Sequence, residues 1–230
     1  MKKLTLCAVI PCLNEEKNVG PVLDKLMHLN VTPIVVDDGS VDKTADIAES
    51  KGAIVIRHSK NKGVGLAMKT GYFHAMNSFN DNSIVLIVAG DGQHDPLEIP
   101  KLVSQILTNK ADYVVGERFS KHPLKFGMPT LNYAFGKLLN HITSMITGIH
   151  VKDSTCGFTA TRISTLRRLK LDLPARAAVP NEILLECASN RIRVAFVPIT
   201  PVYGKKSKIS KLKFLRNALK IYLRYIISER

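Results

Sequence analysis

Acidic side chains follow two apolar segments of this sequence, and they are the residues best placed to do chemistry. The segment 34–36 leads directly into Asp37 and Asp38, and the segment 84–88 leads into Asp91 and Gln93. In an open α/β sheet, ligands bind outside the carboxyl ends of the strands, where carboxylates can hold a ribose, a base or a divalent cation. Asp and Gly are also common in turns, so a turn explains one such segment alone equally well. Two of them, with Glu15 after a third apolar segment, favour a polar ligand site.

The apolar pattern also predicts the elements that must position these residues. Expected strands near 4–10, 32–37, 53–57, 84–89 and 112–116 alternate with expected helices near 16–28, 42–51, 64–78 and 96–108. Ser40 is expected to cap the second helix, and Pro96 to open the fourth, where its missing N–H does no harm. This alternation predicts a mostly parallel sheet covered by helices on both faces.

The second half of the chain is less regular. Its pattern predicts a helix near 130–147, a strand over 157–162, a helix over 181–190 and a strand over 193–197. In a C-terminal helix, apolar residues fall on one stripe: Leu212, Leu215, Leu219, Tyr222 and Ile226. Cations fall on another stripe: Lys213, Arg216, Lys220 and Arg224. Such an amphipathic basic helix either lies on a membrane surface or docks on its own domain, and the two can coexist.

Charge divides the chain into two parts. The net charge is +14, and residues 203–230 carry nine Lys or Arg against one Glu. We therefore expect one α/β domain over 1–202 and a basic loop with a membrane-proximal amphipathic helix over 203–230. Trp is absent and the basic excess is confined to a tail. These features argue against a general nucleic-acid binder and favour an anionic membrane surface or a phosphate-bearing partner.

Cysteine spacing and hydropathy bear on location. Cys7, Cys12, Cys156 and Cys187 show no zinc-type spacing, so we interpret them as reduced packing residues. No apolar run approaches the ~18 residues of a membrane span. The sequence thus predicts a cytoplasmic protein that is peripheral on the cytosolic face of a membrane.

Short motifs carry a resemblance to a known family. In chain order they are Pro11-x-Leu13-Asn14-Glu15, Val36-Asp37-Asp38-Gly39-Ser40-x-Asp42-x-Thr44, Asn61-Lys62-Gly63, Gly90-Asp91-Gly92-Gln93-His94-x-Pro96, Gly116-Glu117-Arg118-Phe119, Asp153-Ser154-Thr155-Cys156-Gly157-Phe158 and Ser207-Lys208. With these motifs the chain resembles the family-2 glycosyltransferases of GT-A fold. Within that family it most resembles the dolichyl-phosphate mannose synthase branch, the polyprenyl-phosphate sugar synthases.

The resemblance implies a fold and an activity. The fold is GT-A, an α/β fold with a Rossmann-like, mostly parallel sheet flanked by helices, over residues 1–202. The activity is inverting, metal-dependent transfer of a hexose, mannose or glucose, from a GDP- or UDP-sugar to a polyprenyl or dolichyl phosphate. Two alternatives stay open: transfer to a glycan hydroxyl, and a non-catalytic relative that binds a nucleotide or a membrane.

The same resemblance implies a metal site. A departing nucleoside diphosphate builds negative charge, which a bound Mg²⁺ or Mn²⁺ neutralises. Asp91 and Gln93 are the expected oxygen ligands. The family motif is Asp-x-Asp, whereas this chain has Ala89-Gly90-Asp91. Asp91 must therefore act with Gln93, phosphate oxygens and water.

The nucleotide sugar is expected to contact residues of most of these motifs. Glu15 and Asp38 are expected beside the base and ribose, with the backbone of Pro11, Leu13 and Val36 along the base. The whole expected set is Pro11, Leu13, Glu15, Val36, Asp38, Lys62, Ala89, Gly90, Asp91, Gln93, Arg118, Lys205 and Lys208.

Three residues are expected to be catalytic: Asp91, Arg118 and Asp153. The Arg118 guanidinium can clamp a phosphate in bidentate fashion. A lipid phosphate is already anionic and needs only positioning and charge neutralisation, whereas a hydroxyl acceptor needs a base, for which Asp153 is the candidate. A turn role before Ser154 explains Asp153 equally well. The family has an Arg where Val202 stands, so Lys205 or Lys206 is the expected substitute.

Overall fold

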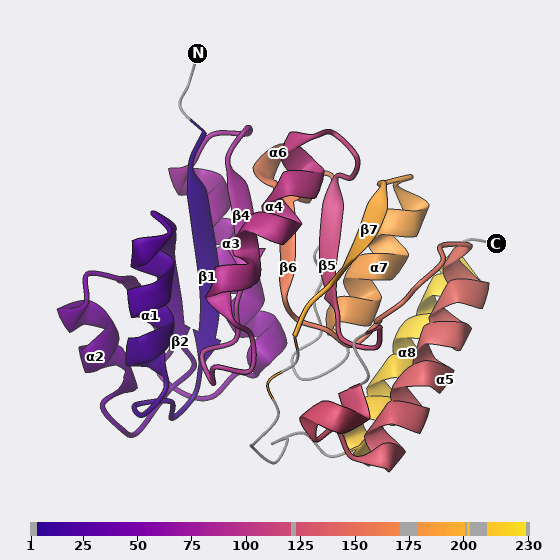
Figure 1. Cartoon of the computed structure of the whole chain (residues 1–230), viewed down its shortest axis with the longest axis horizontal. Helices are drawn as coiled ribbons and strands as arrows, with labels where there is room; N and C mark the ends of the chain where they lie inside the picture. The colour runs from indigo at the N-terminus through magenta and orange to yellow at the C-terminus, as the bar shows by residue number, and fades with distance from the viewer. Residues whose placement is uncertain (1–3, 121–122, 171–178, 201, 203–210, 229–230) are drawn as a thin grey trace.

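The computed structural model of the chain describes residues 4–120, 123–170, 179–200, 202 and 211–228, except for the side chains of 123, 211–215 and 228. Seven strands form one sheet in the order β3-β2-β1-β4-β6-β5-β7 (Figure 1). Their bounds are β1 Leu6–Cys12, β2 Thr32–Asp37, β3 Ile54–Arg57, β4 Ile84–Ile87, β5 Tyr113–Glu117, β6 Thr159–Arg162 and β7 Val194–Pro198.

The sheet is mostly parallel, as the sequence predicts. β1 pairs in parallel with β2 and β4, β2 with β3, and β5 with β7. Only β6 runs antiparallel, between β4 and β5. Residues Cys7, Ala8, Val9 and Ile10 of β1 are all 0% exposed. A central strand covered on both faces has no polar side, which explains the continuous apolar run in the sequence.

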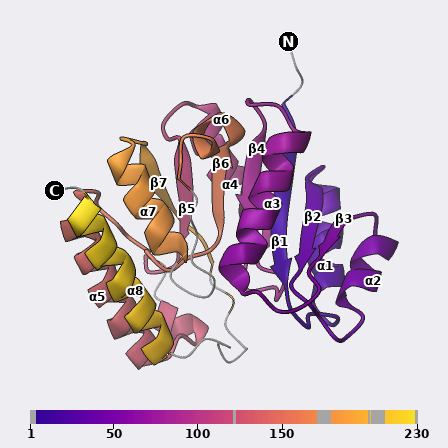
Figure 2. The same ribbon diagram turned by 180° about the vertical axis from the view of Figure 1, so that it is seen from behind.

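Helices cover both faces of this sheet. Their bounds are α1 Val19–His28, α2 Thr44–Ser50, α3 Val64–Ser78, η1 Pro96–Glu98, α4 Ile99–Leu107, η2 Pro123–Phe126, α5 Thr130–Thr147, α6 Ile163–Leu166, α7 Val179–Ser189 and α8 Lys211–Ser228. Helices α1 and α4 lie on the face seen in Figure 1, and α3 and α7 lie on the face seen in Figure 2. The long helices α5 and α8 lie side by side in both views.

Two predictions about helix starts are wrong. The first helix begins at Val19 rather than at residue 16, because the N–H groups of Asn18 and Val19 both donate to the Glu15 carbonyl, at 2.8 and 2.9 Å, and close a turn there. Ser40 does not cap the second helix. Its hydroxyl accepts from Asn14 N at 2.9 Å, and the carboxylate that accepts from Thr44 N, at 3.0 Å, belongs to Asp42.

Pro96 opens its helix as predicted. It is the first residue of η1, which continues into α4, and the Asp95 side chain accepts from Leu97 N at 3.2 Å. The proline therefore occupies a position where no intrahelical donor is needed.

Helix α8 exists as predicted, but the apolar residues of its expected stripe differ in burial; the side chains of Leu212 and Leu215 lie outside the described part of the chain. Tyr222 is 5% exposed, whereas Leu219 and Ile226 are 55% and 41% exposed. The Tyr222 hydroxyl lies 2.7 Å from Thr143 Oγ1 of α5 and accepts from Asn181 Nδ2 of α7 at 2.9 Å. One side of α8 is thus docked on the domain and another remains exposed. No helix within the described ranges is long and apolar enough to cross a membrane.

Candidate functional site

The carboxyl ends of β1, β2 and β4 meet at one edge of the sheet. The register pairs Pro11 of β1 with Val36 of β2, and Asp38 N donates to Cys12 O at 2.9 Å. After β4, Gly90 lies against the same cysteine, because a Cβ at position 90 would come within 2.4 Å of the Cys12 sulfur. The structure thus gathers the expected residues of three separate motifs.

Asp38 is buried, and its carboxylate binds the protein itself. Oδ1 accepts from Lys62 N at 2.9 Å and Oδ2 accepts from Gly63 N at 2.7 Å. Oδ1 also lies 2.7 Å from Nδ1 of His58, whose side chain is only 6% exposed. Asp38 therefore fixes the backbone of the 62–63 segment beside β2. The Lys62 side chain is exposed at that edge, and contact of Asp38 with a ribose stays a prediction.

The segment after β1 is fastened to the segment after β2. Glu15 N donates to Thr44 Oγ1 at 2.7 Å, and the Glu15 carboxylate accepts from Asn18 Nδ2 at 2.6 Å. Leu13 and Pro11 stay half-buried at this edge. The arrangement leaves an ordered, partly apolar wall beside the strand ends, which is suited to a flat base.

Asp91 forms a tight turn at the end of the β4 segment. It is half-buried, and its Oδ1 accepts from Gln93 N at 3.0 Å, across Gly92, whose φ is +77°. In the part of the chain that the structure describes, no three His, Cys, Asp or Glu side chains come close enough together to hold a metal. The Asp91 carboxylate and the Gln93 amide oxygen are suitable ligands for a hard cation, but two protein ligands do not complete its coordination. These residues fit Mg²⁺ or Mn²⁺ where diphosphate oxygens and water complete the coordination.

His94 supports this turn from inside. Its ring stacks on Phe158, with centroids 5.1 Å apart, and its Nδ1 accepts from Ala89 N at 3.2 Å. Burial and the nearby Arg118 charge lower the pKa of His94 to about 3, so the ring is neutral and can accept that bond. His94 therefore anchors the 89–93 turn to the sheet.

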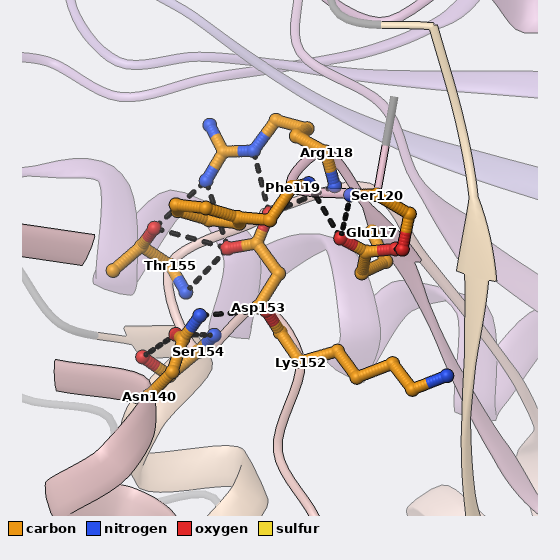
Figure 3. A network of polar contacts seen from close by, with 9 residues as sticks. All are labelled: Glu117, Arg118, Phe119, Ser120, Asn140, Lys152, Asp153, Ser154 and Thr155. Atoms are coloured by element: carbon orange, nitrogen blue, oxygen red, sulfur yellow. Dashed lines mark hydrogen bonds and ion pairs between the residues drawn. The ribbon is translucent and has the colours of Figure 1, made fainter. Parts of the chain in front are cut away.

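Arg118 and Asp153 form one ion pair (Figure 3). The guanidinium Nε donates to Asp153 Oδ2 at 2.7 Å, and Nη2 donates to Oδ1 at 2.9 Å and to Thr155 Oγ1 at 2.7 Å. Asp153 is 0% exposed, and its Oδ1 also accepts from Thr155 N at 3.1 Å, as in the turn role that the sequence allows. Both carboxylate oxygens of Asp153 are therefore engaged by donors of the protein itself.

Asn140 of α5 holds the same segment from the other side (Figure 3). Its Nδ2 donates to Lys152 O at 2.6 Å, and its Oδ1 accepts from Ser154 N at 2.8 Å. Glu117, just before Arg118, accepts from the backbone N–H of Ser120 at 2.7 Å. The ion pair therefore lies between two preorganised loops.

Several of these supporting residues were not predicted from the sequence. They are His58, Thr44, Asn140 and the contact between Cys12 and Gly90. Each acts through a partner far along the chain, so no local pattern marks it. The expected Lys205 and Lys208 lie outside the described residues.

Comparisons with known proteins agree with this fold. Residues 7–170 match the family model described as Glycosyl transferase family 2. A UDP-N-acetylglucosamine–dolichyl-phosphate N-acetylglucosaminyltransferase of Methanococcus voltae is 35% identical over 219 residues, covering 86% of each chain. A dolichol-phosphate mannosyltransferase of Pyrococcus furiosus is 30% identical over 239 residues, covering 97% of this chain and 63% of that protein.

A solved structure shares the fold at lower identity. The glucosyl-3-phosphoglycerate synthase of Mycobacterium tuberculosis, crystallised with Mn²⁺, UDP-glucose and phosphoglyceric acid, superimposes with a TM-score of 0.73 at 20% identity, covering 96% of this chain and 79% of that one.

The family match makes this protein a glycosyltransferase, built on a mostly parallel α/β sheet. The extent of the family match then identifies the chain, which belongs to glycosyltransferase family 2 and resembles its polyprenyl-phosphate sugar synthases.

Proposed function

We propose that this glycosyltransferase moves a hexose, with inversion, from a GDP- or UDP-sugar to a polyprenyl phosphate. One observation carries the proposal: the carboxyl ends of β1, β2 and β4 meet at one edge of the sheet, and the Asp91 turn lies at that edge. Relatives at 35% and 30% identity bear the names of dolichyl-phosphate and dolichol-phosphate sugar transferases.

Donor binding follows from the edge residues. The ordered 13–15 segment and Val36 offer backbone and apolar contacts to a base, and Lys62 supplies an exposed cation beside Asp38. Asp91 and Gln93 would hold Mg²⁺ or Mn²⁺ together with the diphosphate. When bound, such an ion stabilises the charge of the departing diphosphate.

The contacts of Asp153 bear on the kind of acceptor. This carboxylate is the base candidate for a hydroxyl acceptor, yet both of its oxygens are engaged by Arg118. A phosphate acceptor needs no base, because it is already an anion. Burial of Asp153 under Arg118 therefore favours a phosphate over a glycan hydroxyl.

Exposed apolar residues on α5 and α8 bear on where the protein acts. Leu131, Leu138 and Met145 are exposed and follow one another at seven-residue intervals, so they line one side of α5. On the adjacent α8, Leu219, Leu223 and Ile226 are exposed beside the docked face. The molecule carries a net charge of +14. A basic chain with two exposed apolar rows fits an anionic membrane surface, and we propose that the protein acts there, on the cytosolic face.

The test is a transfer assay with purified full chain. GDP-mannose, UDP-glucose and UDP-N-acetylglucosamine are each offered with a polyprenyl phosphate, with and without Mn²⁺. We expect a glycolipid product from at least one donor, and loss of product when polyprenol replaces its phosphate. Equal transfer to polyprenol would contradict the phosphate acceptor. Nucleotide binding without transfer or donor hydrolysis would indicate a non-catalytic binder.

A further inference from the structure

A cavity of about 430 Å³ lies between the loop after β5, one side of α5 and the segment after α5. Four basic side chains contribute to its lining: Lys137, His141, His150 and Lys152. All four are exposed. Figure 3 shows the Lys152 side chain extending away from the Arg118 guanidinium.

The acid in this lining, Glu117, is bound by its own loop and forms no ion pair with Lys137 or Lys152. Glu117 is 1% exposed, and its carboxylate accepts from Phe119 N at 2.5 Å, from Ser120 N at 2.7 Å and from the Ser120 hydroxyl. Neither Lys137 nor Lys152 forms an ion pair with any residue in the described ranges. Like charges gathered in this way repel one another and attract an anion.

Neutral contacts hold this cluster in place. Lys137 Nζ lies 5.7 Å from the ring centroid of Phe119 and 5.8 Å from that of Tyr133. Asn140 Nδ2 donates to Lys152 O at 2.6 Å. These contacts orient the Lys137 ammonium and hold the backbone of Lys152 without neutralising either cation, which reduces the ordering that a ligand must impose.

We propose that this cavity binds a phosphate group, namely the head group of an anionic phospholipid. Lys137 and His141 flank Leu138 on α5, and Leu138 and Met145 are 55% and 72% exposed. A phospholipid held by its phosphate can lay its chains along these residues, which a soluble phosphate compound cannot do. Lipid binding in this cavity is separate from the proposed sugar transfer, which requires no contact there.

The experiment compares two double variants of the full chain. Lys137→Ala/Lys152→Ala removes two cavity cations, and Lys110→Ala/Lys170→Ala removes two exposed cations from other elements. Sedimentation with phosphatidylcholine vesicles, with and without phosphatidylglycerol, measures lipid affinity. Calorimetry with glycerol 1-phosphate measures a soluble phosphate, and calorimetry with GDP and UDP reports on the nucleotide site.

For phosphatidylglycerol vesicles we expect the cavity variant to lose roughly twentyfold in affinity, because each cation near an anionic surface contributes about fivefold. The matched variant should lose much less, and nucleotide binding should be unchanged in both. Equal losses in the two variants would overturn the proposal, because net charge alone would then explain binding. If the cavity variant loses glycerol 1-phosphate binding but binds vesicles as before, the cavity is a phosphate site, and the proposal that its ligand is a phospholipid is wrong.

Discussion

Arg118 and Asp153 are expected from the sequence as separate catalytic groups, and the structure joins them in one ion pair. A substitution at either residue therefore affects the stability of the fold as well as activity. Asp153 is fully buried, so removal of Arg118 leaves a carboxylate without its main donor. A loss of activity in such a variant can then result from weaker acceptor binding or from lower stability of the fold.

Arg118→Ala should therefore lower the free energy of unfolding by about 3 kcal/mol, the usual cost of leaving a buried charge unpaired. Denaturant unfolding monitored by circular dichroism measures this. Adding Asp153→Asn to Arg118→Ala removes the stranded charge and should recover part of the loss. If Arg118→Ala is as stable as the native chain, the pair contributes little and its role is at the acceptor.

Asp91 is the acid that remains in the shortened metal motif, and Ala89 stands where the family has another. Asp91→Ala should abolish the Mn²⁺-dependent part of GDP or UDP affinity and leave the fold intact, because a half-buried strand-tip carboxylate packs little. Ala89→Asp should tighten Mn²⁺ in the presence of the nucleotide, since it adds a hard oxygen ligand. Calorimetry with and without Mn²⁺ measures both. Metal-dependent affinity that survives in Asp91→Ala would contradict the assignment.

At the scale of elements, α3 approaches β1 closely at one position. A Cβ on Gly71 would lie 2.2 Å from Cγ1 of Val9, which is fully buried. Gly71→Ala should therefore destabilise the protein by roughly 1–3 kcal/mol through overpacking, even though Ala favours a helix. Thermal or denaturant unfolding measures the change.

A double-mutant cycle makes this prediction specific. Val9→Ala removes the obstructing methyl groups, so Gly71→Ala/Val9→Ala should be more stable than the sum of the single effects by about 1 kcal/mol. Gly20→Ala on α1 is the matched control, because there the tightest contact of a Cβ, at 3.2 Å, is with the flexible Lys51 side chain, and Ile47 Cγ2 lies at an ordinary 3.7 Å. Additive behaviour at positions 9 and 71 would mean that α3 shifts to relieve the contact.

The elements themselves were predictable because local patterns determine them. The apolar runs of β1, β2 and β4 and the long helix α5 all lie close to their expected bounds. The wrong predictions concern positions whose structure depends on a residue elsewhere in the chain. Ser40 bonds Asn14 instead of capping α2, and the start of α1 is delayed by a turn at Glu15. The ion pair joins residues 35 positions apart, a pairing that spacing does not reveal.

At the scale of the whole molecule, α5 and α8 lie side by side (Figure 2), and both helices carry exposed apolar residues. The sequence predicts the amphipathic character of α8. It does not reveal that Tyr222 packs inward on Thr143 and Asn181 while Leu219 stays outside, because that depends on how α8 meets two other helices.

Replacing Leu219, Leu223 and Ile226 together with Ser should weaken binding to anionic vesicles by about 1 kcal/mol per residue. Stability should hardly change, because these side chains are already exposed. Vesicle sedimentation beside a melting curve measures both quantities. Phe73, Leu97 and Leu107 are equally exposed, and their triple Ser variant is the control. Equal weakening in the two variants would argue against α8 as the membrane contact.

All four cysteines are free and buried. Burial raises the pKa of every one of these thiols, that of Cys7 and of Cys156 to about 12. Such thiols are poor nucleophiles at neutral pH, since only the thiolate reacts. The native chain is therefore a ready background for site-specific labelling. One cysteine introduced at an exposed position on α5 or α8 can carry an environment-sensitive fluorophore, with no need to remove the four that nature placed inside.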